Sequence, residues 1–240
     1  MKLSLFKFTL IIPLFFGFGY WYVVTESDNE LTKNQKIAVE YFKEVALGFE
    51  LGSSSKVTRK WGHDILIYVT GEPNNLLLRE LDTIITDLNR LIPDTGPELR
   101  LTNTSANSNF LIFLGPGSDY AEMDSRAKNN VASNYGLFFV KFNSRNVITS
   151  ATMYVDTERA AEINQRHLLR EELTQALGLA RDSGRFSDSI FQERYSGTAT
   201  SYNQFDEAVI RMLYHPEMRT GLDAESVDPV LRQVVKDVIE

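Results

Sequence analysis

The chain has 240 residues, of which 43% are hydrophobic and 24% are charged, and its formal net charge is −7. These values are typical of a globular protein with one substantial core, so one domain is the default expectation. The positive charges form no Lys/Arg-rich stripe that could neutralise phosphates, and we therefore expect no nucleic-acid partner. The absence of cysteine excludes disulfides, thiolate metal sites and a thiol nucleophile.

Residues 8–24 form an almost uncharged apolar run that follows Lys2 and Lys7. The run is at the short end of what spans a bilayer, and the lysines before it place the bulk of the chain on the extracytoplasmic side. We predict a membrane-targeting helix within residues 1–28, which act as a signal anchor or as a cleaved signal peptide. The protein is expected to be membrane-anchored through residues 8–24 with its domain in the periplasm, or secreted to the periplasm after cleavage.

The remaining elements follow from apolar spacing for helices and from β-branched and aromatic runs for strands. Residues 29–55 are predicted to be a helical juxtamembrane segment and linker, with the helix over 29–51, and residues 56–240 a globular domain. In that domain we predict a strand at 64–69, a helix at 74–91, strands at 98–101 and 110–114, a hairpin at 135–155 with its turn at 143–146, and helices at 158–179, 205–214 and 229–239. This order favours an α+β fold with a mixed, mostly antiparallel sheet and C-terminal helices.

The segment Arg170–Leu179 lies on a predicted helix that directly follows a strand. It resembles the active-site helix of zincin metallopeptidases, particularly the matrixin-like metzincins, in which a His-Glu-x-x-His motif binds zinc and its Glu is the general base. Glu172 matches that Glu, and Gly178 matches the Gly that ends the helix with a left-handed turn. The resemblance implies a zincin-like fold with Glu172 as the catalytic residue. It also implies an extended substrate along an edge strand, here 135–142 or its hairpin partner.

The departures from this motif concern the metal ligands. Glu171 and Gln175 stand at the two helical His positions, and Arg181 stands at the third. Gln is a poor zinc ligand and Arg cannot ligate zinc, so we expect no bound cofactor. If a metal binds, the candidate ligands are Glu171, Gln175 and His167, which lies one turn before Glu171. We take His167, Glu171, Gln175, Arg181 and Asp182 as candidate binding residues.

A longer string carries a second resemblance. The residues of 171–179 continue with Asp182-Ser183, 188–191 and 210–218, and together they resemble a zincin-like bacterial domain family of unknown function. The likeness covers roughly the second half of the chain and implies a relative without an assigned activity.

Three functions remain open on this basis. The leading hypothesis is a cell-envelope protein whose degenerate metallopeptidase-like domain binds a peptide or protein without zinc catalysis. The alternative is an active metal-dependent hydrolase, a peptidase that uses Glu172 as general base with non-standard ligands. The third is a structural anchor whose helix after residue 29 recruits neighbours, with Glu171 and Glu172 forming only the solvated face of a helix.

Overall fold

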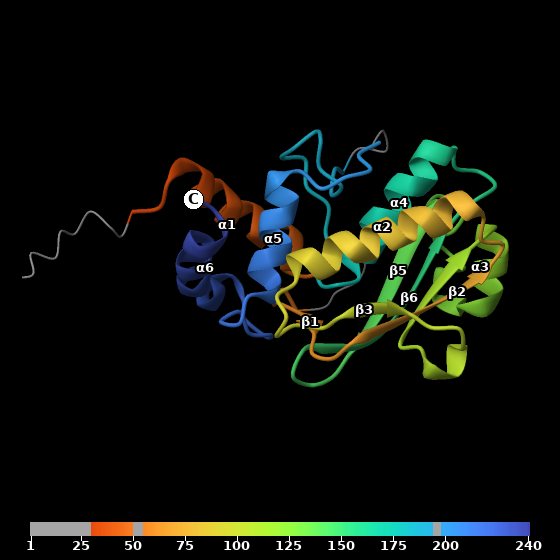
Figure 1. Ribbon diagram of the computed structural model, residues 1–240, viewed down its shortest axis with the longest axis horizontal. Helices are drawn as coiled ribbons and strands as arrows, with labels where there is room; N and C mark the ends of the chain where they lie inside the picture. Colours follow the sequence, from red (N-terminus) through yellow and green to blue (C-terminus); the bar gives the residue numbers. More distant parts are fainter. Residues whose placement is uncertain (1–29, 50–54, 194–197) are drawn as a thin grey trace, which may run out of the picture. The chain divides into compact units, whose positions relative to one another are not determined.

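The computed structural model describes residues 30–49, 55–193 and 198–240 (Figure 1). Residues 31–240 form one compact unit. The expected membrane-targeting helix lies outside the described residues. Within them, no helix is both long and apolar enough to cross a bilayer.

A six-stranded sheet forms the centre of the described chain (Figure 1). Its strands are β1 (Lys60–Trp61), β2 (Ile65–Gly71), β3 (Leu99–Leu101), β4 (Phe110–Leu114), β5 (Gly136–Phe142) and β6 (Val147–Val155). The order is β1-β6-β4-β2-β3, and β5 pairs with β6. Every pair is parallel except β5 with β6, which is antiparallel. The sheet is therefore mostly parallel, with β5 as an antiparallel edge strand.

The prediction of an α+β fold with a mostly antiparallel sheet is wrong. The hairpin was visible in the sequence because its two strands are joined by a short turn, whereas parallel strands pair through crossovers and leave no local signal. One indication was present in β4, where Phe110, Ile112, Phe113 and Leu114 are all buried. Such continuous apolar runs are typical of parallel sheets covered on both faces. The fold is α/β.

Six helices surround the sheet in the described chain, namely α1 (Lys33–Ala46), α2 (Asn75–Leu91), α3 (Gly117–Met123), α4 (Glu162–Gln175), α5 (Gln204–Tyr214) and α6 (Ala224–Val238), with short 3₁₀ turns at Ser105–Asn107 and Ser125–Ala127. Helices α2 and α4 pack against each other, and α4 also contacts β5 and β6. The short α3 packs on the opposite face, where Tyr120 joins Phe113, Leu137 and Tyr154 in a second small core. Helices α1, α5 and α6 pack together, and α5 also contacts α2 (Figure 1).

Three helices begin four or five residues from their predicted starts. Helix α1, predicted over 29–51, spans Lys33–Ala46, and Thr32 caps its first turn. Helix α4 starts at Glu162 and not at 158, because Asp156 caps a separate turn by accepting the backbone N–H groups of Glu158 and Arg159. Helix α6 starts at Ala224, where Asp223 and Ser226 cap each other reciprocally, so that Pro229 lies inside the helix. A proline is frequent at the first position of a helix, which misled the prediction of a start at 229.

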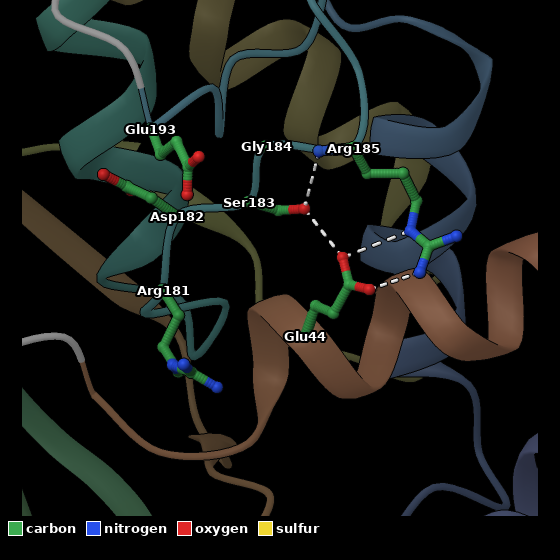
Figure 2. A pocket seen from close by; sticks show the side chains of 7 residues that line it. All are labelled: Glu44, Arg181, Asp182, Ser183, Gly184, Arg185 and Glu193. Atoms are coloured by element: carbon green, nitrogen blue, oxygen red, sulfur yellow. Dashed lines mark hydrogen bonds and ion pairs between the residues drawn. The ribbon is translucent and has the colours of Figure 1, made fainter.

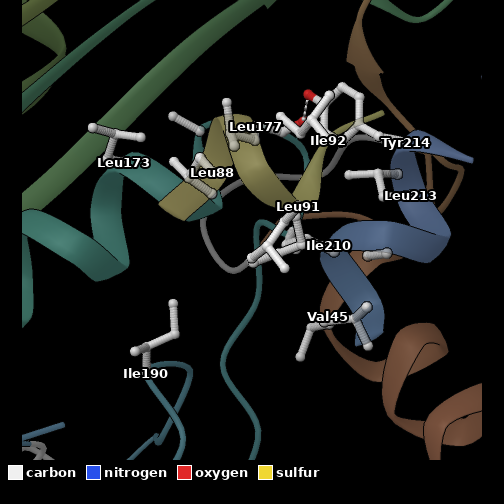
Figure 3. Close-up of a cluster of buried hydrophobic side chains, with 14 of the residues drawn as sticks. Val45, Leu88, Leu91, Ile92, Leu173, Leu177, Ile190, Ile210, Leu213 and Tyr214 are labelled. Carbon is white, nitrogen blue, oxygen red and sulfur yellow. Dashed lines mark hydrogen bonds between the residues drawn. The ribbon is translucent and has the colours of Figure 1, made fainter. Parts of the chain in front are cut away.

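The C-terminal end of α4 is fixed by groups from β1 and α5. Tyr214 Oη donates to the carbonyl of Leu177 at 2.9 Å (Figure 3), and Trp61 Nε1 donates to the carbonyl of Ala176 at 2.9 Å. These bonds satisfy carbonyl groups that a helix end leaves unpaired. Gly178 follows with φ of 121°, which confirms the predicted left-handed turn, and an added Cβ there would lie 2.0 Å from the carbonyl oxygen of Arg59.

Gly178→Ala is therefore expected to lower the free energy of unfolding by more than about 3 kcal/mol, because backbone strain and a backbone clash add. Gly48→Ala is the matched control, since Gly48 has φ of +104° but the nearest heavy atom to an added Cβ is 3.5 Å away. It should cost only about 1–2 kcal/mol. Urea unfolding followed by circular dichroism measures both values, and equal losses would contradict the proposed role of the close approach to Arg59.

Candidate functional site

Helix α4, which carries most of the predicted site, is polar and yet buried along most of its length. The buried polar residues are Gln165, His167, Arg170, Glu171, Glu172, Thr174 and Gln175. Because buried polar side chains are hydrogen-bonded in folded proteins, the partners of these groups define what the helix does. Residues three or four apart share a face of a helix. The buried polar residues of α4 therefore form three rows: the first contains His167, the second Glu172 and the third Arg170.

The first row contains His167, Glu171 and Gln175. His167 Nε2 lies 3.3 Å from Glu171 Oε2, and His167 Nδ1 lies 2.8 Å from the carbonyl oxygen of Ala199. Gln175 Nε2 donates to Asp182 Oδ1 at 2.6 Å. The structure thus brings four predicted site residues together as two bonded pairs on one face of α4. His167 contacts Glu171, and Gln175 contacts Asp182 of the following loop.

The protonation of His167 depends on Glu171. Burial alone would lower the pKa of His167, but the hydrogen bond and negative charge of Glu171, together with the carbonyl of Ala199, raise that pKa above its ordinary value of 6.5. Both ring nitrogens face acceptors, and only the imidazolium form donates from both. His167 and Glu171 therefore form a hydrogen-bonded pair at the position where the resemblance implied a metal, and the negative charge of Glu171 favours protonation of the imidazole.

Glu172 belongs to a different face of α4. It is 7% exposed, and an added Cβ on Gly136 of β5 would lie 2.5 Å from its Oε1 atom. Burial raises the pKa of Tyr154, and the nearby charge of Glu172 contributes to that rise. Adjacent helical residues point about 100° apart, which is why Glu172 packs beside β5 while Glu171 pairs with His167.

The third row was missed in the sequence. Arg170 is 1% exposed, and its guanidinium donates to Glu80 Oε1 at 3.1 Å and to Asp87 Oδ2 at 2.8 Å. The same group lies 4.7 Å from the centroid of the Tyr202 ring, while Arg166 Nε donates to Glu80 Oε2 at 2.8 Å. The available signal was in α2, where Glu80 and Asp87 are seven residues apart on one helical face.

An open cavity of about 550 Å³ lies beside Asp182 and is lined by Glu44, Arg181, Asp182, Ser183, Gly184, Arg185 and Glu193 (Figure 2). Arg185 donates to both carboxylate oxygens of Glu44, and Ser183 Oγ donates to Glu44 at 2.7 Å. The bonds from Arg185 hold the pKa of Glu44 below its ordinary range. Arg181 points away from this group (Figure 2), although its charge also helps to lower the pKa of Glu44. Arg181 thus does not join the first row.

The outer side of β5 is an open hydrogen-bonding edge. The N–H of Asp156 donates to the carbonyl of Tyr135 at 2.7 Å, which fixes the phase of the β5–β6 ladder. Opposed pairs alternate between bonded and non-bonded in an antiparallel ladder. Gly136, Phe138 and Val140 therefore direct their backbone N–H and C=O groups away from β6, and no described strand pairs with them. The sequence left the edge open between 135–142 and its hairpin partner. In the structure β5 is the edge, because β6 pairs with both β4 and β5.

The helix-facing side of this edge is apolar. Phe138 and Val140 pack partly against the main core, and the ring of Phe49 stacks on Phe142 with centroids 6.1 Å apart. An added Cβ on Gly48, the residue before Phe49, would lie 3.9 Å from Cδ of Arg181. Arg181 is thereby linked through this short segment to the Phe142 end of β5.

The hypothetical ligand set Glu171, Gln175 and His167 is engaged in two separate contacts. Glu171 and His167 contact each other, and Gln175 is bonded to Asp182. Among the described residues, no group of three His, Cys, Asp or Glu side chains is arranged to hold a metal ion.

The fold and the site define a mixed α/β domain in which an open antiparallel edge strand lies beside a buried polar helix. A family model described as "Protein of unknown function (DUF2927)" matches residues 35–233, and the chain belongs to this family. No curated protein matches the chain. The predicted membership in a family of unknown function is confirmed, while these comparisons give no support to the likeness to zincins.

The raised pKa of His167 makes a prediction about pH. A pKa that is higher in the folded state contributes stability that is fully present below the unfolded value of 6.5 and is lost as pH rises through the folded-state pKa. The free energy of unfolding of the parent should exceed that of His167→Gln most at low pH, and the gap should narrow as pH rises. Glu171→Gln should remove the same pH dependence. Chemical unfolding from below pH 6.5 upward measures the difference in unfolding free energy between the parent and each variant. A difference that is independent of pH would contradict the pairing of His167 with Glu171.

The Arg170 row makes a prediction about stability. Arg170→Met leaves Glu80 and Asp87 without their buried partner and should cost about 3 kcal/mol or more of unfolding free energy. Arg166→Met is the matched control, because Arg166 bonds the same Glu80 but its side chain is 34% exposed. It should cost less than about 1 kcal/mol. Urea titration distinguishes the two, and similar losses would show that the burial of Arg170 is not what matters.

Proposed function

We propose that this domain binds an extended peptide segment of a partner protein by strand addition to β5 and does not hydrolyse it. The observation that carries the proposal is the open edge, where Gly136, Phe138 and Val140 direct backbone donors and acceptors away from β6. A peptide that adds as a strand needs only such groups for affinity, and alternate side-chain contacts give specificity.

The sequence of β5 lacks the features that usually protect an edge strand from pairing, which supports a binding role. Natural edge strands are usually protected by proline, inward charges or very short length, because open edges promote aggregation. Strand β5 is seven residues long, contains no proline and carries one charged residue, Lys141. Phe142 and Tyr135, at its two ends, are 39% and 42% exposed. A register shift between Lys141 and Phe142 ends the regular ladder, so the usable edge fits a short peptide.

The positive charge of Arg181, beside the edge, favours a peptide with an acidic residue. Arg181 forms no ion pair in the described chain, although its charge helps to lower the pKa of Glu44, and it lies near the segment that stacks on Phe142. An acidic side chain of the peptide at the Phe142 end would pair with this guanidinium. We therefore propose a peptide with apolar residues at alternate positions and one acidic residue toward that end.

The contacts of α4 support binding without hydrolysis. Glu171 and Gln175, at the positions of the zinc ligands in the resembled motif, are engaged with His167 and Asp182. Glu172 is 7% exposed and packs against Gly136, where it supports the start of β5. The extracytoplasmic location of the domain and of its partner stays a prediction.

Peptides selected from a displayed random library on the full chain test this proposal. Val140→Pro removes one outward N–H without removing a bond to β6, and it should weaken the selected peptides about tenfold, the effect of one lost hydrogen bond with added steric conflict. Val140→Ala keeps the N–H and serves as the control. Calorimetric titration measures the affinities, and unfolding curves confirm that both variants fold.

Further variants separate the parts of the proposal. Arg181→Gln should weaken only those peptides that carry the acidic residue. If no peptide is selected, or if Val140→Pro binds as well as Val140→Ala, strand addition to β5 is wrong. Cleavage of a selected peptide that disappears in Glu172→Gln would contradict the non-hydrolytic part.

A further inference from the structure

A second cavity, of about 610 Å³, uses none of the residues of the proposed peptide site. Its walls are β1, the turn between β5 and β6, and the segment 218–221 that follows α5. Cavities of this size hold small organic ligands. The lining residues that matter are Lys60, Trp61, Arg145, Val147, Met218 and Arg219.

The charges of this cavity have one sign. Lys60, Arg145 and Arg219 line it, and no acidic residue does. The guanidinium groups of Arg145 and Arg219 have no hydrogen bond or ion pair within the described ranges, and Lys60 Nζ donates to the carbonyl of His215 at 3.5 Å.

Most arginines elsewhere in the described chain pair with carboxylates. The net charge of the chain is −7, and nine arginines of the described ranges pair with carboxylates: Arg90, Arg100, Arg126, Arg159, Arg166, Arg170, Arg185, Arg211 and Arg232. An acidic chain therefore leaves three cations unneutralised around one cavity. Such an arrangement creates a local positive potential that attracts an anion.

The half-buried Lys60 strengthens this argument. Its ammonium group lies 5.9 Å from the centroid of the Tyr214 ring, and burial lowers its pKa to about 8. Burial penalises the charged form of lysine, and a nearby negative charge reverses the penalty. The described protein supplies no such charge, so a bound anion would.

The walls of the cavity are tied together by hydrogen bonds. Thr58 Oγ1 donates to the carbonyl of Arg219 at 2.8 Å, and the N–H of Gly221 donates to the carbonyl of Thr58 at 2.8 Å. Thr220 Oγ1 donates to the carbonyl of Arg145 at 2.7 Å, and Lys60 pairs with Val147 in the sheet. The three cations are thus carried by segments whose backbones are already positioned, which lowers the entropic cost of binding.

We propose that this cavity binds a small organic anion, whose carboxylate or phosphate group lies among Lys60, Arg145 and Arg219 and whose apolar part contacts Val147 and Met218. Met218 is 1% exposed and Val147 is partly buried, so the lining offers apolar surface beside the charges. The combination matches ordinary ligand cavities, in which a few charged groups orient a mostly apolar ligand.

Calorimetric titration of the full chain with benzoate, phenyl phosphate, inorganic phosphate and neutral benzamide tests this inference. Benzoate or phenyl phosphate should bind with a stoichiometry of one, and the tighter of the two identifies the anionic group. Inorganic phosphate should bind about tenfold more weakly because it lacks the apolar part, and benzamide should not bind.

Variants locate the binding. Lys60→Met and Arg219→Gln should each weaken the tighter anion about tenfold, as expected for the loss of a charge-assisted hydrogen bond. Lys128→Met, which removes an exposed lysine elsewhere, should leave the affinity unchanged. In the parent chain the anion should also raise the pKa of Lys60, as measured by NMR of its side chain. Arg219→Gln changes an exposed side chain and leaves the core intact. The proposal is overturned if neither aromatic anion binds or if benzamide binds equally well. It is also overturned if Lys128→Met weakens binding as much as Arg219→Gln does.

Discussion

The burial of a polar helix is the constraint on which the rest of this structure depends. Helix α4 places charged and amide groups on three of its faces, and each group has to meet a partner because an unpaired buried charge costs several kcal/mol. Arg170 meets Glu80 and Asp87 of α2, and Glu172 meets the start of β5. A rotation of α4 by one residue would break all of these contacts together, so the helix fixes α2, β5 and the following loop in one arrangement.

The buried carboxylate of Asp206 positions the loop that contacts α4. Asp206, at the start of α5, accepts hydrogen bonds from Ser189 Oγ at 2.7 Å, from Tyr41 Oη at 3.0 Å and from the N–H of Ile190 at 3.1 Å. Burial raises the pKa of Asp206, and these hydrogen bonds partly offset that rise. The motif at 188–191, which stood out in the sequence, is therefore explained by the joining of α1, the loop and α5.

The sequence predicted what depends on neighbours along the chain and not what depends on distant partners. Apolar periodicity located α2 and α5 closely, and the turn at 143–146 revealed the hairpin. The direction of the other strands depends on pairs such as Ile67 with Phe110, which no local pattern encodes. Helix α3 escaped notice because it has only seven residues, from Gly117 to a 3₁₀ turn, too few for a periodic signal.

For the candidate site, too, the sequence predicted the local contacts and missed those between separate elements. The i, i+4 spacing of His167 and Glu171 placed them on one face, and the two side chains are paired. The bond from Gln175 to Asp182 requires the chain to reverse after Gly178, and the contacts of Arg170 require α2 to lie beside α4. Sequence spacing contains neither fact, because both depend on how separate elements pack.

These contacts also explain how a domain with this helix can retain a binding role without catalysis. The polar row on α4 is hydrogen-bonded from within, with His167 beside Glu171 and Gln175 beside Asp182. The edge of β5 is not, since its outward backbone groups meet no described strand. The row lies on α4 and the edge lies on β5. The stability of α4 and the open edge of β5 are therefore separate requirements on the sequence, and Gly136, packed against Glu172, is the residue at which they meet.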